Sequence, residues 1–252
     1  MSVVLKGHLT LTKAPIKEAL IDIRVKLSSD FDVKKIDSIY EKIKETYPGK
    51  QEQTVSQVQI ERQLGKESFK SLTKINGYRY LSINKDKIFQ ARLDGFTFNR
   101  LPPYTIWEEL RNEAKRLWLL YRDATSPEII TRVALRYINN LNIPTSIDFG
   151  DYLMAPPVLP EGLPQGLNGF LIRLNVHIPE LEANAIITQA LEPMPLKSDK
   201  IPVILDIDVF KEKTEAPGIE EGEAWNLLER MRHFKNEVFF KFITEKLKEI
   251  YK

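Results

Sequence analysis

Apolar and polar residues alternate from residue 19 to residue 27. Successive side chains of a strand point to opposite faces, so this alternation predicts a β-strand with one buried face and one wet face. The segment from Arg132 to Leu141 shows the same alternation, with Arg132, Arg136 and Asn140 on its polar side. We expect both strands to belong to a sheet that is apolar on one face. The apolar side chains of the first strand are Ala19, Ile21, Ile23, Val25 and Leu27.

Apolar residues spaced three or four apart occur in three further stretches. Residues at that spacing share one face of a helix, so each stretch predicts an amphipathic helix that covers an apolar sheet face. The three stripes are Ile36, Ile39, Tyr40, Ile43 and Tyr47; Trp107, Leu110, Ala114, Leu117, Trp118 and Tyr121; and Leu227, Met231, Phe234, Val238 and Phe242.

Short strands are predicted between these helices, at 54–62, 78–84, 88–93 and 96–98 and again at 170–177, 185–191 and 202–210. Close spacing and the Asp94-Gly95 turn signal predict that they run antiparallel. In the second half the first helix is reduced to a stretch near 146–153, and a proline-rich loop follows from Pro156 to Gly169.

The order strand, helical stretch, three strands and long helix therefore occurs twice, in Ala19–Tyr121 and in Arg132–Lys252. We predict an α+β fold, in which antiparallel strands pack against helices, with an internal duplication. The halves would be residues 1–126 and 127–252, packed as one compact unit. Any two-layer α+β protein could show this order by chance, and that alternative stays open.

The composition is that of an ordinary globular protein, with 42% hydrophobic and 29% charged residues in 252 positions. The sequence has no apolar run near the roughly 18 residues of a membrane span, and we expect no membrane partner. It contains no cysteine, which excludes disulfides and thiolate metal sites. A reducing, cytoplasmic location is the compartment we expect.

The charge is distributed unevenly along the chain. Residues 1–126 hold 23 Lys and Arg against 16 Asp and Glu, a net charge of +7, whereas the remainder carries −5. A basic half can meet an anionic partner such as nucleic acid. The alternative is that the charges are spread over solvated faces, where they pair with one another or with a second subunit.

Most catalytic constellations are missing from the sequence. Its three histidines lie on three separate predicted elements, and neither a zinc-protease motif, a phosphate-binding loop, a dinucleotide fingerprint nor a nucleophile elbow occurs. We therefore expect no cofactor, and a non-enzymatic role is favoured over an enzyme.

One pair of carboxylates is a candidate cation site. Asp206 and Asp208 are two residues apart in a predicted strand, so both lie on the same face. Two neighbouring carboxylates can bind a divalent cation or act as acid and base. A polar outer face, with Leu205, Ile207 and Val209 in the core, is the simpler interpretation.

Arginines on the strands form a second candidate surface. Arg24, Arg132 and Arg136 project from strands whose opposite faces are apolar, and such side chains can hold phosphates or carboxylates. The alternative is cross-strand pairing with acids such as Asp22. Four more arginines lie in predicted strands: Arg62, Arg79, Arg92 and Arg173.

Several separated strings resemble a sporadically distributed, uncharacterised bacterial family of about this length, and the resemblance covers essentially the whole chain. It directs interest to Arg100, Arg132, Arg136 and Asn139 as polar members of these strings. It implies no catalytic residues, and the patchy distribution implies mobile or defence-associated gene neighbourhoods. The strings are Pro15 to Arg24, Asp94 to Leu101 with Pro103, Tyr104 and Trp107, Thr131 to Asn139, Leu205 to Asp208, and Lys235-Asn236 with Phe239, Ile243 and Thr244.

By analogy of fold alone, a duplicated antiparallel sheet with helices on one face is similar to the saddle of the TATA-box-binding protein and to helix-grip folds. We predict first a non-catalytic interaction or regulatory protein, and a homodimer is among the expected assemblies. It would meet an unidentified macromolecule through the sheet face or the loop Pro156 to Gly169. The alternatives are a nucleic-acid-binding module that uses the basic half, and a small-ligand binder or enzyme with a pocket between sheet and helices.

Overall fold

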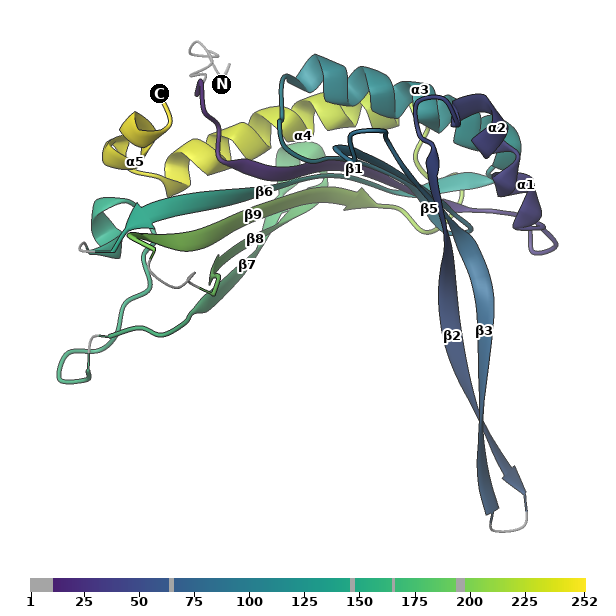
Figure 1. Ribbon diagram of the computed structural model, residues 1–252, viewed down its shortest axis with the longest axis horizontal. Helices are drawn as coiled ribbons and strands as arrows, with labels where there is room; N and C mark the ends of the chain where they lie inside the picture. Colours follow the sequence, from purple (N-terminus) through teal and green to yellow (C-terminus); the bar gives the residue numbers. More distant parts are fainter. Residues whose placement is uncertain (1–10, 64–65, 146–147, 165, 194–197) are drawn as a thin grey trace. The chain divides into compact units, whose positions relative to one another are not determined.

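The computed structural model describes residues 11–63, 66–145, 148–164, 166–193 and 198–252, with side chains described for all of these except residues 57–72. Strands and helices follow one another in the order drawn in Figure 1. In chain order the elements are β1 (Ile16–Lys26), α1 (Lys34–Asp37), α2 (Ile39–Ile43), β2 (Gly49–Gln63), β3 (Lys66–Leu81), β4 (Lys87–Arg92), β5 (Gly95–Arg100), α3 (Trp107–Thr125), β6 (Ile129–Pro144), η1 (Phe149–Asp151), β7 (Leu171–Ile178), η2 (Pro179–Leu181), β8 (Ala183–Leu191), β9 (Lys200–Glu212), α4 (Glu221–Phe242) and α5 (Glu245–Ile250).

Within the described residues, the strands form one nine-stranded sheet in the order β2-β3-β4-β5-β1-β6-β9-β8-β7. Strands that are consecutive along a hairpin pair antiparallel, as do β1 and β5. The protein is therefore an α+β protein with a large antiparallel sheet, and that part of the predicted fold class is confirmed.

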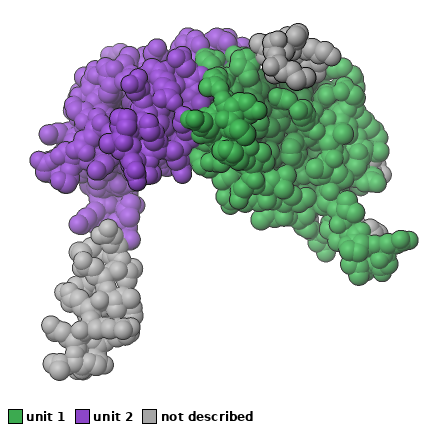
Figure 2. Space-filling model, turned by 180° about the vertical axis from the view of Figure 1, so that it is seen from behind, with its two compact units in different colours: residues 1–18, 136–210, 229–252 green, residues 19–135, 211–228 purple. Residues whose placement is uncertain are grey.

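The chain divides into two compact units, which Figure 2 shows in different colours. Unit 1 consists of Met1–Glu18, Arg136–Phe210 and Glu229–Lys252, and unit 2 of Ala19–Leu135 and Lys211–Leu228. Four elements, β1, β6, β9 and α4, contribute residues to both units. The predicted halves, 1–126 and 127–252, are two continuous segments of the chain. Each compact unit instead combines segments from both of these halves.

The core of unit 2 lies between α3 and the apolar face of its strands. Phe96 of β5 packs edge-on against Trp118 of α3, with ring centroids 5.9 Å apart. The Tyr121 hydroxyl donates a hydrogen bond of 2.8 Å to the carbonyl oxygen of Arg92 on β4. All six residues of the predicted apolar stripe of α3 are buried, as are Ala19, Ile21, Ile23 and Val25 of β1. Both predictions are confirmed.

The predicted helix of residues 36–47 is two short helices, α1 and α2, which meet at Ser38. The Ser38 hydroxyl donates a hydrogen bond of 2.7 Å to the Lys35 carbonyl oxygen. A serine that bonds to a nearby carbonyl competes with regular helical hydrogen bonding. The predicted apolar stripe is nevertheless buried, except for Tyr40, which is half-buried and stacks on Tyr80.

In unit 1, α5 and the second part of α4 lie on one side of β6 and β9 (Figure 1). Apolar residues of β9 are buried, and so are Met231, Val238 and Leu247 on the helices. The C-terminus is held to β6, because the backbone N–H of Asn142 donates a hydrogen bond of 2.9 Å to the Tyr251 hydroxyl. The predicted helix near 146–153 is reduced to η1, and residues 146 and 147 lie outside the described residues.

The hairpin of β2 and β3 is longer than predicted. These strands pair from Gly49 and Leu81 to Gln63 and Lys66, whereas β4 pairs only with residues 77–81 of β3. Beyond β4 they continue as the two-stranded ribbon that Figure 1 shows. The strand over residues 66–77 was not predicted from the sequence. Where side chains of the ribbon are described, adjacent residues are exposed, at 54–56 on β2 and at 73–74 on β3, so these positions show no alternation of buried and exposed side chains.

Candidate functional site

Asp22 of β1 is a buried carboxylate that binds three arginines in unit 2. Its oxygens accept hydrogen bonds from Arg24 Nε at 2.9 Å, Arg132 Nη1 at 3.0 Å and Arg92 Nη2 at 3.3 Å. The Thr97 hydroxyl donates a fourth bond at 2.7 Å. The structure thus brings together Arg24 and Arg132, two of the predicted site residues, and places both on the face of the sheet opposite the buried apolar side chains of β1.

Further acids balance these arginines. Asp94 accepts hydrogen bonds from Arg24 and, at 3.0 Å, from Arg92 Nε, and Glu212 forms an ion pair with Arg132 at 3.3 Å. Three guanidinium groups thus meet three carboxylates. A phosphate that approached this surface would compete with carboxylates already in place. We call this group the Asp22 cluster: Asp22, Arg24, Arg92, Asp94, Thr97, Arg132 and Glu212.

Gly95 makes the approach of β5 to β1 possible beneath the cluster. It lies directly opposite both Arg24 on β1 and Arg92 on β4. Its φ is +150°, and a Cβ atom there would lie 2.4 Å from the Ile23 carbonyl oxygen and 3.1 Å from Cδ of Arg24. Gly95 therefore leaves room for the Arg24 side chain, which passes through the space that a side chain at position 95 would occupy and reaches Asp22 and Asp94.

The electrostatics of the cluster raise the pKa of Arg24. Burial lowers the pKa of Arg24, but the charges of Asp22 and Asp94 and their hydrogen bonds outweigh it and raise that pKa above its ordinary value. The Arg24 side chain is 36% exposed, whereas that of Asp22 is 7% exposed. Solvent and a partner can therefore reach the arginine but scarcely the carboxylate.

Arg136, on β6 in unit 1, makes a bidentate ion pair with Asp206 of β9. Its Nε and Nη2 donate to the two carboxylate oxygens at 2.8 and 2.6 Å. These hydrogen bonds exceed the effect of burial and raise the pKa of Arg136. Asp208 adds its charge to the same guanidinium.

The candidate cation site at Asp206 and Asp208 gains no support from this geometry, because Asp206 is engaged by a guanidinium. In the part of the chain that the structure describes, no group of three or more His, Cys, Asp or Glu side chains could hold a metal ion. The polar-face interpretation agrees with the burial of Leu205, Ile207 and Val209.

Asn139 does not share the face of the arginines. It is buried on the core side of β6, where its amide donates a hydrogen bond of 3.0 Å to the Leu205 carbonyl oxygen of β9. Its described contact is structural. Of the other strand arginines, Arg92 belongs to the Asp22 cluster, and the side chain of Arg62 lies outside the described residues.

Arg100 lines a charged cleft of about 440 Å³ in unit 2, separate from the Asp22 cluster. It forms an ion pair with Asp86. Beside it, Glu113 accepts hydrogen bonds from Tyr47 at 2.7 Å and from Arg116 at 2.8 and 2.9 Å. We call this the Arg100 cleft; its main polar side chains are Tyr47, Asp86, Lys87, Arg100, Glu113 and Arg116.

These contacts shift the pKa values of two side chains in the Arg100 cleft, Glu113 and Tyr47. Burial alone would raise the pKa of Glu113, but hydrogen bonds from Arg116 and Tyr47 lower it below its usual range. Burial, with the charge of Glu113, raises the pKa of Tyr47. At neutral pH the cleft therefore presents a protonated phenol between carboxylates and cations, a surface that suits a small zwitterion.

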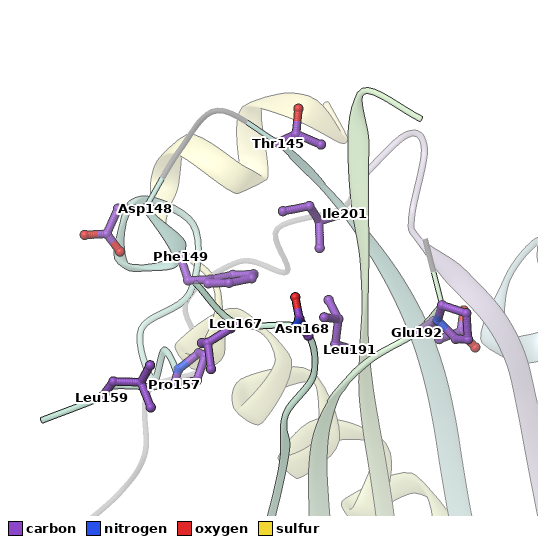
Figure 3. A pocket seen from close by; sticks show the side chains of 11 residues that line it. Thr145, Asp148, Phe149, Pro157, Leu159, Leu167, Asn168, Leu191, Glu192 and Ile201 are labelled. Carbon is purple, nitrogen blue, oxygen red and sulfur yellow. The ribbon is translucent and has the colours of Figure 1, made fainter. Parts of the chain in front are cut away.

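Unit 1 contains a larger cavity, of about 770 Å³. Figure 3 shows the Phe149 ring, Leu191 and Ile201 directed into it, while Asp148 points away. Asp148 instead accepts a hydrogen bond of 2.9 Å from the Gly150 backbone N–H. The predicted loop contributes residues 157, 159, 167 and 168 to the lining, whereas its residue 165 lies outside the described residues.

Lys235 of α4 is a buried cation that sequence analysis did not select as a site residue. Its Nζ lies 3.6 Å from the centroid of the Tyr137 ring, a cation–π contact, and the residue is 7% exposed. Burial and the charge of Arg232 lower its pKa to about 7. A signal for it was present in the sequence, because Lys235 stands four residues after Met231 and three before Val238, in the middle of an apolar stripe.

The chain matches no protein-family model, no curated protein and no solved structure. The resemblance to a bacterial family stays a prediction. Among the described residues, no helix has both the length and the apolar character needed to cross a membrane.

Proposed function

We propose that the chain is a non-catalytic interaction protein that contacts a macromolecular partner through the strand face that carries the Asp22 cluster. The observation that carries this function is the set of hydrogen bonds by which Asp22 fixes three arginines. Arginine is enriched at protein interfaces, and a side chain already held in place loses less entropy on binding. Arg24 is both held in place and partly exposed, which suits a contact residue.

The same hydrogen bonds argue against nucleic-acid binding by this face. Arg24, Arg92 and Arg132 each pair with a carboxylate, so the cluster presents little uncompensated charge to nucleic acid. Binding of a polyanion relies on cations that it can neutralise. A protein partner with its own mixed charges fits such a balanced surface better.

Cross-linking in the native cell tests this function. Lys26 follows Arg24 on the same face of β1, and we expect lysine-directed cross-links from the partner to reach it. Arg24→Ala should weaken capture of that partner at least tenfold, whereas Arg111→Ala on α3 should leave it unchanged. Cross-links confined to the helices, or equal capture by both variants, would refute the assignment.

The Arg100 cleft supports a second candidate function, the binding of a small zwitterionic ligand. Its cations and carboxylates lie together in about 440 Å³, between the strands and α3. Thermal shift with a panel of free amino acids tests it. We expect stabilisation by at least one of them, and its loss in Arg100→Met. No shift with any member of the panel would exclude this ligand class.

We also propose that the protein arose by duplication. In the first half, the sheet neighbours of β1 run outward as β5, β4 and β3, and in the second the neighbours of β6 run outward as β9, β8 and β7. The first strand of each half thus lies beside the last strand of that half. This shared strand order supports the duplication of one ancestral unit. It also supports the predicted saddle or helix-grip arrangement. Among the described residues, the second half has no strand that corresponds to β2.

The remaining expectations concern the biological setting. We propose a cytoplasmic, bacterial protein, supported by the lack of cysteine and by the family resemblance of the sequence. A role near mobile or defence genes rests on the resemblance alone. Sequencing of the gene neighbourhood in several hosts tests it, since housekeeping genes on both sides would contradict the association.

A further inference from the structure

β7 is an edge strand whose outer side carries no partner strand among the described residues. It pairs with β8 over its whole length, from Leu171 and Ala190 to Ile178 and Ala183, without a bulge. Edge strands usually carry a bulge, a proline or several charges that prevent pairing with other chains. β7 has one charged residue, Arg173, and exposes Leu171 by 71%, Leu174 by 42% and Val176 by 36%.

The register with β8 tells which backbone groups of β7 face outward. The Phe170 carbonyl oxygen accepts a hydrogen bond of 3.1 Å from the Leu191 N–H. Hydrogen-bonded pairs alternate along an antiparallel ladder, so residues 172, 174, 176 and 178 direct their N–H and C=O groups to β8. Residues 171, 173, 175 and 177 direct theirs outward. An incoming strand must pair with these four.

We propose that β7 is a dimerisation strand that pairs antiparallel with β7 of a second copy of this chain, about a twofold axis at Leu174. In this register residue 171 pairs with 177 of the copy, and 173 with 175, so all four outward-facing residues form hydrogen-bonded pairs. The added strand would occupy the position next to β7, which corresponds to that of β2 beside β3 and which no described strand of the second half fills.

Side-chain chemistry selects this register among those that the backbone permits. It places Arg173 opposite an asparagine, Leu174 opposite Leu174, and Ile172 opposite Val176. A register centred on residue 173 would oppose two arginines, and like charges directly opposite destabilise a sheet. A register centred on Asn175 would place Arg173 opposite His177, and it would leave Leu171 without a partner residue in β7, which ends at Ile178. In this register β7 therefore pairs apolar with apolar side chains and keeps the two arginines apart, and this self-complementary apolar pattern favours a second copy over an unrelated strand.

A cysteine scan tests the axis, because the chain has no cysteine of its own. Residues opposite each other at a non-hydrogen-bonded antiparallel site have Cα atoms about 4.5 Å apart, which a disulfide can span. We expect Leu174→Cys to form a covalent dimer on mild oxidation. Ile83→Cys, at another exposed apolar position, in unit 2, should form at least tenfold less covalent dimer. Equal cross-linking of both, or cross-linking of Asn175→Cys but not Leu174→Cys, would overturn the register.

Sedimentation velocity of the unmodified full chain tests the dimer itself. We expect the dimer fraction to rise with protein concentration, and Leu174→Lys to weaken dimerisation at least tenfold by placing two ammonium groups opposite each other. Asn175→Asp should strengthen it, because the carboxylate would face Arg173. A wild-type chain that stays monomeric up to its solubility limit would refute the dimer, whatever partner binds the Asp22 cluster.

Discussion

At the scale of single residues, Asp22 shows how much can depend on one carboxylate. It is the common acceptor for arginines from β1, β4 and β6, so its charge holds side chains from three strands in place. Its own exposure is small, and removal of one partner from a buried ion pair leaves the other charge uncompensated.

Asp22→Asn should therefore lower the free energy of unfolding by about 3–5 kcal/mol. Asp94→Asn is the matched control, since Asp94 binds two of the same arginines but its side chain is 53% exposed. Exposed pairs contribute about 0–1 kcal/mol, so that variant should change stability little. Urea titration measures both, and a smaller loss for Asp22→Asn than for Asp94→Asn would contradict the role given to Asp22.

Lys235 makes stability depend on pH. Its folded pKa of about 7 lies below the ordinary value of 10.5, so between these values the unfolded chain binds more protons than the folded one. The free energy of unfolding should therefore rise as the pH increases from 7 to 10.5.

Lys235→Met should remove that contribution and stabilise the protein below pH 7, by about 1–4 kcal/mol. The lost cation–π contact with Tyr137 will offset part of the gain. Thermal or urea denaturation from pH 6 to pH 10 measures the effect. Parallel pH profiles for the variant and the wild type would show that Lys235 keeps its proton throughout.

At the scale of elements, the strands and helices that the sequence predicts correctly are those with one buried face and one exposed face. β1, β6 and α3 each have one core face, and a core face must be apolar at the repeat of the element that forms it. The strand over residues 66–77 belongs to a two-stranded ribbon and had no such pattern to find. Ser38 divided a predicted helix through a local side-chain bond, which periodicity does not record.

The packing of α3 gives an element-scale prediction. Trp118 is 1% exposed and contacts Phe96, whereas its neighbour Leu119 is 36% exposed. Trp118→Ala should lower the free energy of unfolding by about 3–5 kcal/mol, through lost burial and the cavity that remains. Leu119→Ala should change it by about 0.5 kcal/mol or less. Equal losses in urea denaturation would mean that the two helix faces are not distinguished by burial.

At the scale of the whole molecule, β1, β6, β9 and α4 have residues in both compact units. Unfolding of either unit would disrupt strands that the other shares. We therefore expect one cooperative transition, although longer chains often unfold through intermediates.

Tryptophan fluorescence tests this cooperativity, because Trp107, Trp118 and Trp225 all lie in unit 2, whereas far-UV circular dichroism reports on both units. The two urea curves should coincide. Lys235→Met, a change in unit 1, should shift the tryptophan curve as much as the dichroism curve. Separate transitions, or a shift in dichroism alone, would mean that the units unfold independently.

The sequence by itself determined the α+β class, the apolar faces and the order of elements, because burial imposes a period on each element wherever it packs. It also supplied the arginines on the polar side of β1 and β6. Only the tertiary structure decided that Arg24 and Arg132 meet at Asp22, and that Arg100 lies in a separate cleft. Such contacts join strands distant in the chain, and the strand order that brings them together has no local signature.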